Sequence, residues 1–180
     1  YMKDLRTSEG QLCFLVESFI KTARLEQGIM QVHMQKGNLV EAILNALGQI
    51  QKKAEDKDIF FQVKLPEKII CEHDKNWMCE ALYNVFDNAV KYSKSNSTID
   101  ITMKQTEMFY KIQIRDYGIG IKDGEENKIF QRFYRGEQTR GQEGCGIGLY
   151  LSREIVLLQK GMMKAKQMKP GLLIEVNLPV

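Results

Sequence analysis

The chain has 180 residues, 43% hydrophobic and 27% charged, which is typical of a globular protein with one domain, a short appendage and a sizeable core. Its net charge of +3 is small, and Lys and Arg are interspersed with acids, so a nucleic-acid-binding surface is not indicated. No apolar run is long enough to cross a bilayer, and no signal peptide opens the chain. Because the first residue is Tyr1, we expect a fragment of a longer protein, with any membrane attachment in the sequence outside it.

Cysteine and histidine usage argues against a metal-centred or disulfide-stabilised domain. The chain has four cysteines, none in a CxxC spacing: Cys13, Cys71, Cys79 and Cys145. With only His33 and His73 to assist them, neither a zinc site nor a disulfide framework is predicted. Four free thiols are typical of a reducing compartment. Both histidines are expected to be surface or loop residues.

The first third of the chain predicts two amphipathic helices. The first covers residues 8–26, with Ser8 as its N-cap and Gly28 just beyond its end. The second covers residues 39–56, begins after Asn38 and is rich in lysine at its end, as the helix dipole favours. The apolar stripe of the first helix consists of Leu12, Leu15, Val16, Phe19 and Ala23.

The rest of the chain mixes strands with two further helices. Strands are predicted over residues 59–65, 69–71, 98–104, 109–115 and 172–178, the last of them closing the sheet. Residues 98–104 and 109–115 read as an antiparallel pair. Helices are predicted over residues 77–93, with Asp74 as a possible N-cap, and over 146–159. The polar, glycine-containing segment 122–143 is too long for an ordinary connection, which favours a functional lid.

The helix WMCEALYNVFDNAVKYS, residues 77–93, carries polar side chains that an ordinary surface helix does not need. Asn84 and Asn88 lie one turn apart, and Lys91 follows three residues later, so all three share one side. Two carboxamides and an ammonium suit a magnesium ion with phosphates, because Mg²⁺ takes few protein oxygens and relies on the substrate for the rest. Asparagine is also common on solvated helix faces, so this face alone leaves both interpretations open.

Two glycine-bearing motifs follow. In DYGIGI, at the end of a strand, Gly118 and Gly120 let the backbone approach a flat ligand, and Asp116 could accept a hydrogen bond from an exocyclic amine. A turn or β-bulge often has the same residues. In GCGIGLYL, at the start of a helix, glycines 144, 146 and 148 expose amide groups where the helix dipole favours phosphate. This string is neither a Rossmann fingerprint, since it follows a long polar segment, nor a Walker loop, since no GK[ST] follows.

A fourth motif, IFQRFYRG, lies inside the expected lid. Phe130 and Phe133 are three residues apart, with Arg132 and Arg135 beside them. Aromatic side chains at this spacing can hold a lid against the domain while arginines face phosphate. A short amphipathic turn with solvated arginines would have the same pattern.

The order NVFDNAVKYS, DYGIGI, IFQRFYRG, GCGIGL resembles the N, G1, F and G2 boxes of the ATP-binding (GHKL, Bergerat-type) domain of sensor histidine kinases. The resemblance covers roughly residues 59–180. In addition, TARLEQG is similar to the end of the second helix of the dimerisation and phosphotransfer domain. The resemblance as a whole implies an α+β fold, a two-layer α/β sandwich with a mixed sheet covered by helices on one face, preceded by an N-terminal helical segment. Residues 1–36 would belong to the incomplete dimerisation domain and residues 37–180 to the ATP-binding domain with its leading helix.

The resemblance also implies roles for individual residues. Asn88 would be the magnesium ligand, while Asn84, Lys91 and Tyr92 would contact phosphate or nucleotide; Asn84, Asn88 and Lys91 would form the catalytic group. Asp116 would read the adenine amine. The other implied nucleotide-binding residues come from the G1 box, the lid and the G2 box: Gly118, Gly120, Ile121, Phe130, Phe133, Arg135, Gly144, Gly146, Ile147, Gly148 and Leu149.

The implied function is that of a catalytic fragment with ATP and Mg²⁺ as cofactors. In the full-length protein the γ-phosphate would pass to a histidine and then to an aspartate on a response-regulator receiver domain. The implied protein is cytoplasmic, a homodimer through its dimerisation domain, free of nucleic-acid partners and attached to a membrane only by missing N-terminal segments. No phosphoacceptor motif resembling HELRTPL exists here, so the fragment is expected to bind ATP without phosphorylating itself. The stripe from Leu12 to Ala23 would pair with another chain or stay partly exposed.

One position bears on the mechanism. Related ATPases of the gyrase and chaperone type have a water-activating glutamate one turn before the magnesium asparagine, where this chain has Asn84. Such a site is expected to hydrolyse ATP poorly and to hold the γ-phosphate for another acceptor. Glu80, a further turn away, is a less suitable base. The alternatives are an anti-sigma-type serine kinase, against which TARLEQG and the helix from Leu39 argue, and a nucleotide-binding interaction module without kinase activity.

Overall fold

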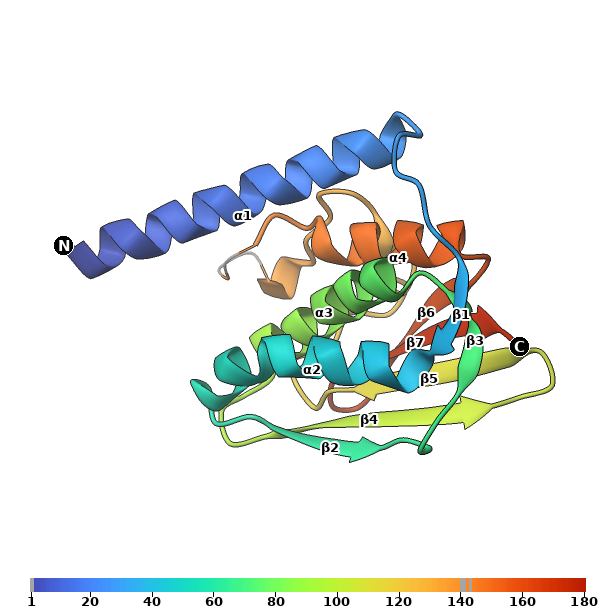
Figure 1. Ribbon diagram of the computed structural model, residues 1–180. Helices are drawn as coiled ribbons and strands as arrows, with labels where there is room; N and C mark the ends of the chain where they lie inside the picture. Colours follow the sequence, from blue (N-terminus) through green and yellow to red (C-terminus); the bar gives the residue numbers. More distant parts are fainter. Residues whose placement is uncertain (1, 140–141, 143) are drawn as a thin grey trace.

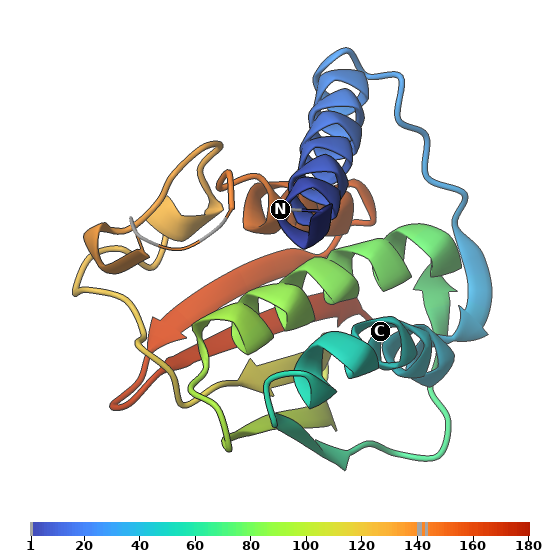
Figure 2. The ribbon, with the colours of Figure 1, turned by 90° about the vertical axis from the view of Figure 1, so that its left-hand side faces the viewer.

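A five-stranded mixed sheet forms one layer of the protein, and three helices cover one of its faces (Figures 1 and 2). The computed structural model describes residues 2–139, 142 and 144–180, with only the backbone described for residues 2–11. The strand order is β2-β4-β5-β7-β6, and β2 runs parallel to β4 while the other neighbours are antiparallel. The strands are β2 (Phe60–Lys64), β4 (Thr98–Gln105), β5 (Phe109–Arg115), β6 (Met162–Gln167) and β7 (Leu172–Pro179). The mixed two-layer sandwich expected from the sequence is confirmed.

The helical layer contains the segments that the apolar periodicity predicts. Two short strands, β1 (Gln35–Asn38) and β3 (Ile70–His73), pair antiparallel beside it, and two single-turn 3₁₀ helices, η1 (Lys128–Phe130) and η2 (Glu137–Thr139), lie in the lid. The helices are α1 (Met2–Glu26), α2 (Leu39–Glu55), α3 (Lys75–Tyr92) and α4 (Gly148–Leu158). In the part of the chain that the structure describes, no helix combines the length and the apolar composition that a membrane crossing requires.

The core lies between the sheet and α2, α3 and α4. Alternate residues of β4 and β5 point into it, among them Ile101 and Ile112, both fully buried. They meet the apolar face of α3, where Leu82 and Phe86 are also fully buried. This packing holds α3 between α2 and α4 and leaves its polar face toward α4 and the lid, which is where the functional residues were predicted.

Side-chain caps fix where α2 and α3 begin. Asn38 Oδ1 accepts from the N–H of Val40 at 3.3 Å, at the start of α2. Asp74 Oδ1 accepts from the N–H groups of Asn76 and Trp77 at 3.1 and 3.0 Å, which confirms the predicted N-cap of α3. Caps of this kind satisfy the first N–H groups of a helix and set its start.

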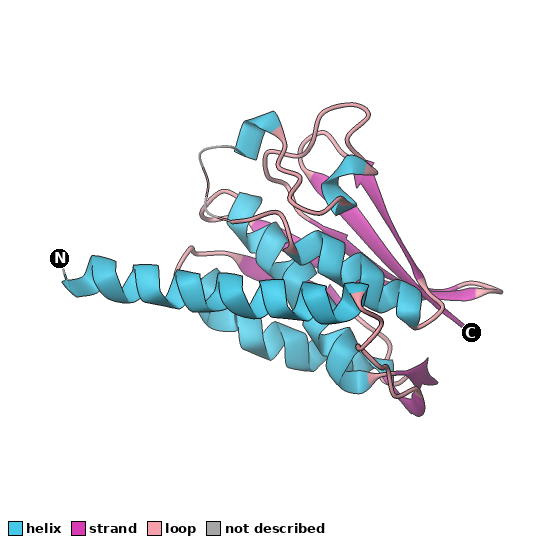
Figure 3. Cartoon of the chain, turned by 90° about the horizontal axis from the view of Figure 1, so that it is seen from above, coloured by secondary structure: helices cyan, strands magenta, loops and turns pink. Residues whose placement is uncertain are grey.

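The N-terminal helix α1 lies across the helical layer and packs against α4 (Figures 1 and 3). It ends where expected, since Gly28 has φ +66° and donates to Leu25 O at 3.0 Å. Its inner face includes buried Ser18 and Thr22, whereas Leu12 and Phe19 of the apolar stripe are 63% and 60% exposed. In this single chain the apolar stripe is therefore partly exposed, which was one of the two expectations.

The structure corrects several details of the sequence prediction. The helix α1 begins at Met2, so Ser8 lies within it and is not an N-cap. Strand β6 was not predicted, and because β6 pairs with the outer edge of β7, the C-terminal strand does not close the sheet. His33 is exposed as expected, but His73 is buried, with its Nδ1 3.1 Å from Cys71 O. The predicted boundary between the two domains, after residue 36, falls within strand β1. The division into two domains remains a prediction.

Candidate functional site

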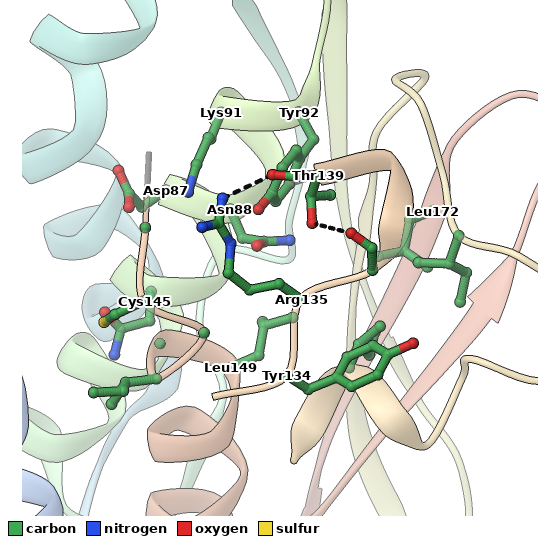
Figure 4. Close-up of a pocket in the computed structure, with 18 of the residues that line it drawn as sticks. Asp87, Asn88, Lys91, Tyr92, Tyr134, Arg135, Thr139, Cys145, Leu149 and Leu172 are labelled. Atoms are coloured by element: carbon green, nitrogen blue, oxygen red, sulfur yellow. Dashed lines mark hydrogen bonds between the residues drawn. The ribbon is translucent and has the colours of Figure 1, made fainter. Parts of the chain in front are cut away.

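One cavity of about 130 Å³ lies between α3, the turn after β5, the lid and the start of α4 (Figure 4). It brings together residues of all four predicted motifs, although these are far apart in the sequence. Of the residues predicted for the site, those that line it are Asn84, Asn88, Lys91, Tyr92, Asp116, Gly120, Ile121, Arg135, Gly144, Gly146, Ile147, Gly148 and Leu149. Gly118, Phe130 and Phe133 do not line it.

Helix α3 supplies the polar wall of the cavity. Asn84, Asp87, Asn88 and Lys91 follow one another at helical spacing and all line the cavity. Asn84 is only 7% exposed, yet its Nδ2 has no hydrogen-bond partner among the described residues. A buried amide donor without a partner is costly, so this atom suits an acceptor that a ligand brings. Asp87, which the sequence analysis did not single out, pairs with Lys53 of α2 at 2.9 Å.

Asp116 is the buried carboxylate at the other end of the cavity. The N–H groups of Gly118 and Leu172 donate to its Oδ1 at 2.9 and 3.3 Å. Both described hydrogen bonds go to Oδ1, which leaves Oδ2 as an acceptor for a ligand donor. Burial raises the pKa of Asp116, and the two N–H bonds and Arg115 oppose that rise. A fixed, desolvated carboxylate of this kind can select a ligand that carries an N–H group in one orientation.

Gly118 lets the turn after β5 pack directly on the end of α3. A Cβ at this position would lie 2.1 Å from the carbonyl oxygen of Tyr92, which no side chain could tolerate. The neighbouring Ile119 N–H donates to the same oxygen at 3.3 Å. Gly118 therefore shapes the site by close approach, without lining the cavity itself.

The glycine loop before α4 closes the cavity on its third side. Gly146 has φ +71°, and a Cβ there would lie 2.6 Å from Tyr134 O, so the loop and the lid meet through backbone alone. The Lys91 ammonium lies against Gly144, where a Cβ would be 2.1 Å from its Nζ. Gly148 and Leu149, the first residues of α4, line the cavity, and the N-cap residue Ile147 makes no side-chain hydrogen bond to the first turn. A cation and uncapped helix N–H groups thus face one space, which favours an anion.

The lid enters the cavity from the fourth side. Figure 4 shows Arg135 reaching from the lid toward Asn88 and Lys91. Its guanidinium donates to Thr139 O at 2.7 Å and to Gln142 O, which ties η2 to the cavity wall. Its Nε is buried without a hydrogen-bond partner among the described residues. Residues 140–141 and 143 of the expected lid lie outside the described part of the chain.

Glu125 holds the base of the lid together. It is buried, and its two carboxylate oxygens accept from the Tyr134 hydroxyl at 2.8 Å and from the Lys122 N–H at 2.9 Å. These bonds join the end of the DYGIGI turn to the IFQRFYRG segment. The internal order of the lid therefore rests partly on a carboxylate that the sequence analysis did not single out.

The two lid phenylalanines have structural contacts. Phe130 is buried in the core, with the Arg153 guanidinium 5.4 Å from its ring centroid. Phe133 is half exposed and stacks on Phe19 of α1, with 6.4 Å between ring centroids. Beside it, Arg132 pairs with Glu26 of α1. These side chains attach the lid to its surroundings, as the aromatic spacing indicated, while Arg135 alone of the two arginines faces the cavity.

Several residues that line the cavity were missed. They come from α1, α3, the lid and the start of β7: Phe14, Asp87, Glu125, Ile129, Tyr134, Gly136, Gln138, Thr139 and Leu172. Asp87 could have been found, since it lies three residues after Asn84 on the same helical face. The others depend on how the lid folds and on which strand lies beside β5, neither of which the sequence pattern specified.

The donor set fits a magnesium ion only in combination with ligand oxygens. Among the described residues, no group of three or more His, Cys, Asp or Glu side chains lies close enough to hold a metal. The cavity instead offers the amide oxygen of Asn88 beside a lysine and the helix N-terminus. Mg²⁺ keeps few protein ligands and is often bound with substrate phosphates, so this set fits it.

Comparisons with known proteins agree with this geometry. Residues 73–180 match the family described as histidine kinase-, DNA gyrase B-, and HSP90-like ATPase. The sensor histidine kinase MtrB of Mycolicibacterium paratuberculosis is 30% identical over 154 residues, which is 84% of this chain and 27% of that protein. The chain thus spans about a quarter of the length of this curated relative.

Two solved structures have the same fold. The mycobacterial sensor histidine kinase MprB superposes with a TM-score of 0.73 at 25% identity, over 82% of this chain and 97% of the other. Full-length ShkA, solved in complex with AMPPNP, superposes with a TM-score of 0.82 at 18% identity, over 99% of this chain and 38% of the other. At that identity ShkA shows the fold alone.

Proposed function

Because the chain belongs to the family of histidine kinase-, DNA gyrase B- and HSP90-like ATPases, we propose that its cavity binds Mg-ATP for transfer of the γ-phosphate to a histidine. The chain is homologous to the catalytic domains of sensor histidine kinases, which are ATP-dependent protein-histidine kinases. The observation that carries the proposal is the meeting of all four motifs in one cavity, with an amide-and-lysine wall facing a helix N-terminus. ShkA, which has this fold, was solved with AMPPNP.

The base of the nucleotide would lie against Asp116. Its carboxylate is fixed by two N–H bonds to Oδ1, so Oδ2 can accept from the exocyclic amine of adenine. Ile121 and Leu172 line the same end of the cavity and supply apolar contacts for the flat ring. The backbone turn at Gly120 allows that ring to lie close to the chain.

The phosphates would lie at the opposite end. The Lys91 ammonium lies against Gly144 of the glycine loop, and Gly148 and Leu149, the first residues of α4, line the same cavity. Asn88 would supply a protein oxygen to Mg²⁺, which neutralises charge on the phosphate oxygens when bound. Arg135 brings a further positive charge from the lid. The chain's own part in the transfer is to position the nucleotide and to compensate its charge.

The contents of the cavity favour phosphate transfer over hydrolysis. The residue one turn before Asn88 is Asn84, whose amide cannot act as a general base at neutral pH. Glu80 is held by Lys21 of α1 at 2.6 Å and does not line the cavity. With no well-placed base to activate water, the γ-phosphate would be kept for another acceptor.

The acceptor and the partners would belong to the whole protein. There, the phosphoryl group would move to a histidine and then to an aspartate on a response-regulator receiver domain. The exposed apolar stripe of α1 would pair with other helices in a homodimer, and the domain would lie on the cytoplasmic side of a membrane-attached sensor. A serine kinase of the anti-sigma type is not favoured, because the relative matched over 84% of this chain is a sensor histidine kinase.

Calorimetric titration with ADP, with and without Mg²⁺, tests the binding proposal. We expect saturable binding that Mg²⁺ strengthens. Transfer is then tested by supplying γ-labelled ATP together with a separate helical hairpin that contains a phosphoacceptor histidine. If the hairpin becomes labelled, and its phosphoryl label is stable to base and labile to acid, the result supports a histidine kinase. Mg-ADP binding without any transfer would favour the interaction-module alternative, and absence of binding would refute the proposal altogether.

A further inference from the structure

The last turn of α3 is anchored from outside the helix. A helix leaves its last four carbonyl groups without intrahelical partners. In α3, Ala89 O accepts from the N–H of Ser93 at 3.1 Å and from its hydroxyl at 2.6 Å. Tyr92 O accepts from the N–H of Ile119 at 3.3 Å. The two carbonyls between them, at Val90 and Lys91, need donors from elsewhere.

Lys57 supplies both donors. Its ammonium donates to Val90 O at 2.9 Å and to Lys91 O at 2.8 Å, so one side chain completes the C-terminus of α3. A cation at this end also interacts favourably with the helix dipole. Partial burial removes some of the hydration of this ammonium and lowers the pKa of Lys57. The two carbonyls compensate for that loss.

The turn that ends α2 holds Lys57 in place. The Asp58 N–H donates to Glu55 O at 3.0 Å and the Ile59 N–H to Ala54 O at 2.8 Å, the paired pattern of a Schellman turn. Asp58 occupies the left-handed position of this turn with φ +54°, and Ile59 is buried in the core. Since α2 and α3 pack side by side, the turn delivers the lysine stem directly to the end of α3 (Figure 2).

The anchored turn is the one that carries cavity residues. Lys91 and Tyr92 both line the cavity, and the Lys91 ammonium reaches across it to Gly144. Fixing the Lys91 carbonyl fixes the backbone from which that ammonium extends. Asp116, at the other end of the cavity, is held by Gly118 and Leu172 instead. Lys57 does not line the cavity itself, and both of its described hydrogen bonds go to the α3 turn at the Lys91 end.

We propose that Lys57 is a positioning residue for the phosphate end of the nucleotide site: by capping α3 it holds Lys91 and Tyr92 in place for the phosphates. This inference rests on the proposed function. A residue that acts in this way should matter for ligands that carry phosphates and not for those that carry only the base and ribose. A purely structural residue would affect both alike.

The test compares two ligands on matched variants. Lys57→Met keeps most of the side-chain length but removes the donors, Lys57→Arg restores donors and charge, and Lys104→Met removes an exposed lysine of β4 as the control. Calorimetry with Mg-ADP and with adenosine gives the two affinities. We expect Lys57→Met to weaken Mg-ADP binding about tenfold, as loss of charged hydrogen bonds at a partly exposed site would, and adenosine binding less than twofold. Lys57→Arg should recover most of the loss, and Lys104→Met should match the wild type.

Amide hydrogen exchange gives a second readout, which remains available if Lys57→Met weakens folding. The N–H of Ser93, which closes the last turn of α3, should exchange about tenfold faster in Lys57→Gln, while amides in β5 keep their rates. Equal weakening of Mg-ADP and adenosine, unchanged Mg-ADP affinity, or unchanged exchange at Ser93 would overturn the inference. If the wild type itself fails to bind Mg-ADP, the proposed function is refuted first, and the role of Lys57 in it falls too.

Discussion

Replacing Asp116 by asparagine changes one atom of the site and leaves its shape. The Asn Oδ1 can still accept from the N–H groups of Gly118 and Leu172, whereas the oxygen left for the ligand becomes an NH₂ group. An exocyclic amine would then meet a donor in place of a charged acceptor. Loss of a hydrogen bond to a charged group costs about 1.5–3 kcal/mol, so ADP affinity should fall roughly tenfold to 150-fold.

The same substitution should not destabilise the fold at neutral pH. Burial raises the pKa of Asp116 in the folded state, so the folded protein favours the protonated carboxyl. The resulting stability is present at low pH and is lost as pH rises through the folded-state pKa. Asparagine resembles the neutral form at every pH. The variant should therefore unfold at the same or a higher temperature than the wild type at pH 7. On acidification the stability of the wild type should rise relative to that of the variant.

Calorimetry with ADP and thermal unfolding at several pH values together check this reasoning. Adenosine has no phosphate to titrate, so its affinity for the wild type reports on Asp116. That affinity should fall on acidification, and the fall should begin at a higher pH than it would for an aspartate with an ordinary pKa. An Asp116→Asn protein that binds ADP within twofold of the wild type would exclude the carboxylate from base recognition. A variant that binds weakly but also melts well below the wild type at pH 7 would show that Asp116 is structural.

Three further outcomes follow from packing. Phe86 is fully buried beneath α3, so Phe86→Ala should lower the free energy of unfolding in urea by about 3–5 kcal/mol, and a loss below about 1 kcal/mol would contradict the described core. Gly118→Ala would place a Cβ 2.1 Å from Tyr92 O, so ADP affinity measured by calorimetry should fall at least about tenfold; wild-type affinity would show that the turn relaxes freely. Burial raises the pKa of the Cys71 thiol to about 11, whereas Cys13 is exposed, so a thiol reagent at pH 8 should label Cys13 quickly and Cys71 only after unfolding, as mass spectrometry would show.

The elements with a single strong period were predictable from the sequence. The helices from Leu39 and from Asp74 have complete apolar stripes and side-chain caps, and the structure places both starts where the caps indicate. Strand β6, MMKAKQ, escaped prediction because methionine and alanine give weak β signals and its outward residues are lysines. Its position at the sheet edge, where charged side chains are common, accounts for that composition.

The candidate site was predictable where a motif placed residues by backbone geometry alone. The face of α3 and the glycine loop reach the cavity because helical spacing and a glycine-rich turn leave little choice. The lid was harder: Phe130 and Phe133 were expected at the nucleotide, yet one packs in the core and the other on α1. Their contacts depend on surfaces brought from distant segments. Lys57 is the clearest example, since nothing in KKAEDKDIF indicates that this lysine reaches across to α3.

The 3₁₀ turn η2 has a thermodynamic consequence for any ligand of the cavity. The space of about 130 Å³ is smaller than the roughly 300 Å³ or more of usual small-molecule sites, and lid residues such as Thr139 line it. For a ligand that binds only when η2 has withdrawn, the observed Kd equals the intrinsic value divided by the population of such lid conformations. If that population were about 1%, affinity would be about 100-fold weaker than the contacts alone provide. The Tyr134–Glu125 hydrogen bond orders the base of the same lid, so Tyr134→Phe would change that population, and the observed Kd would change with it.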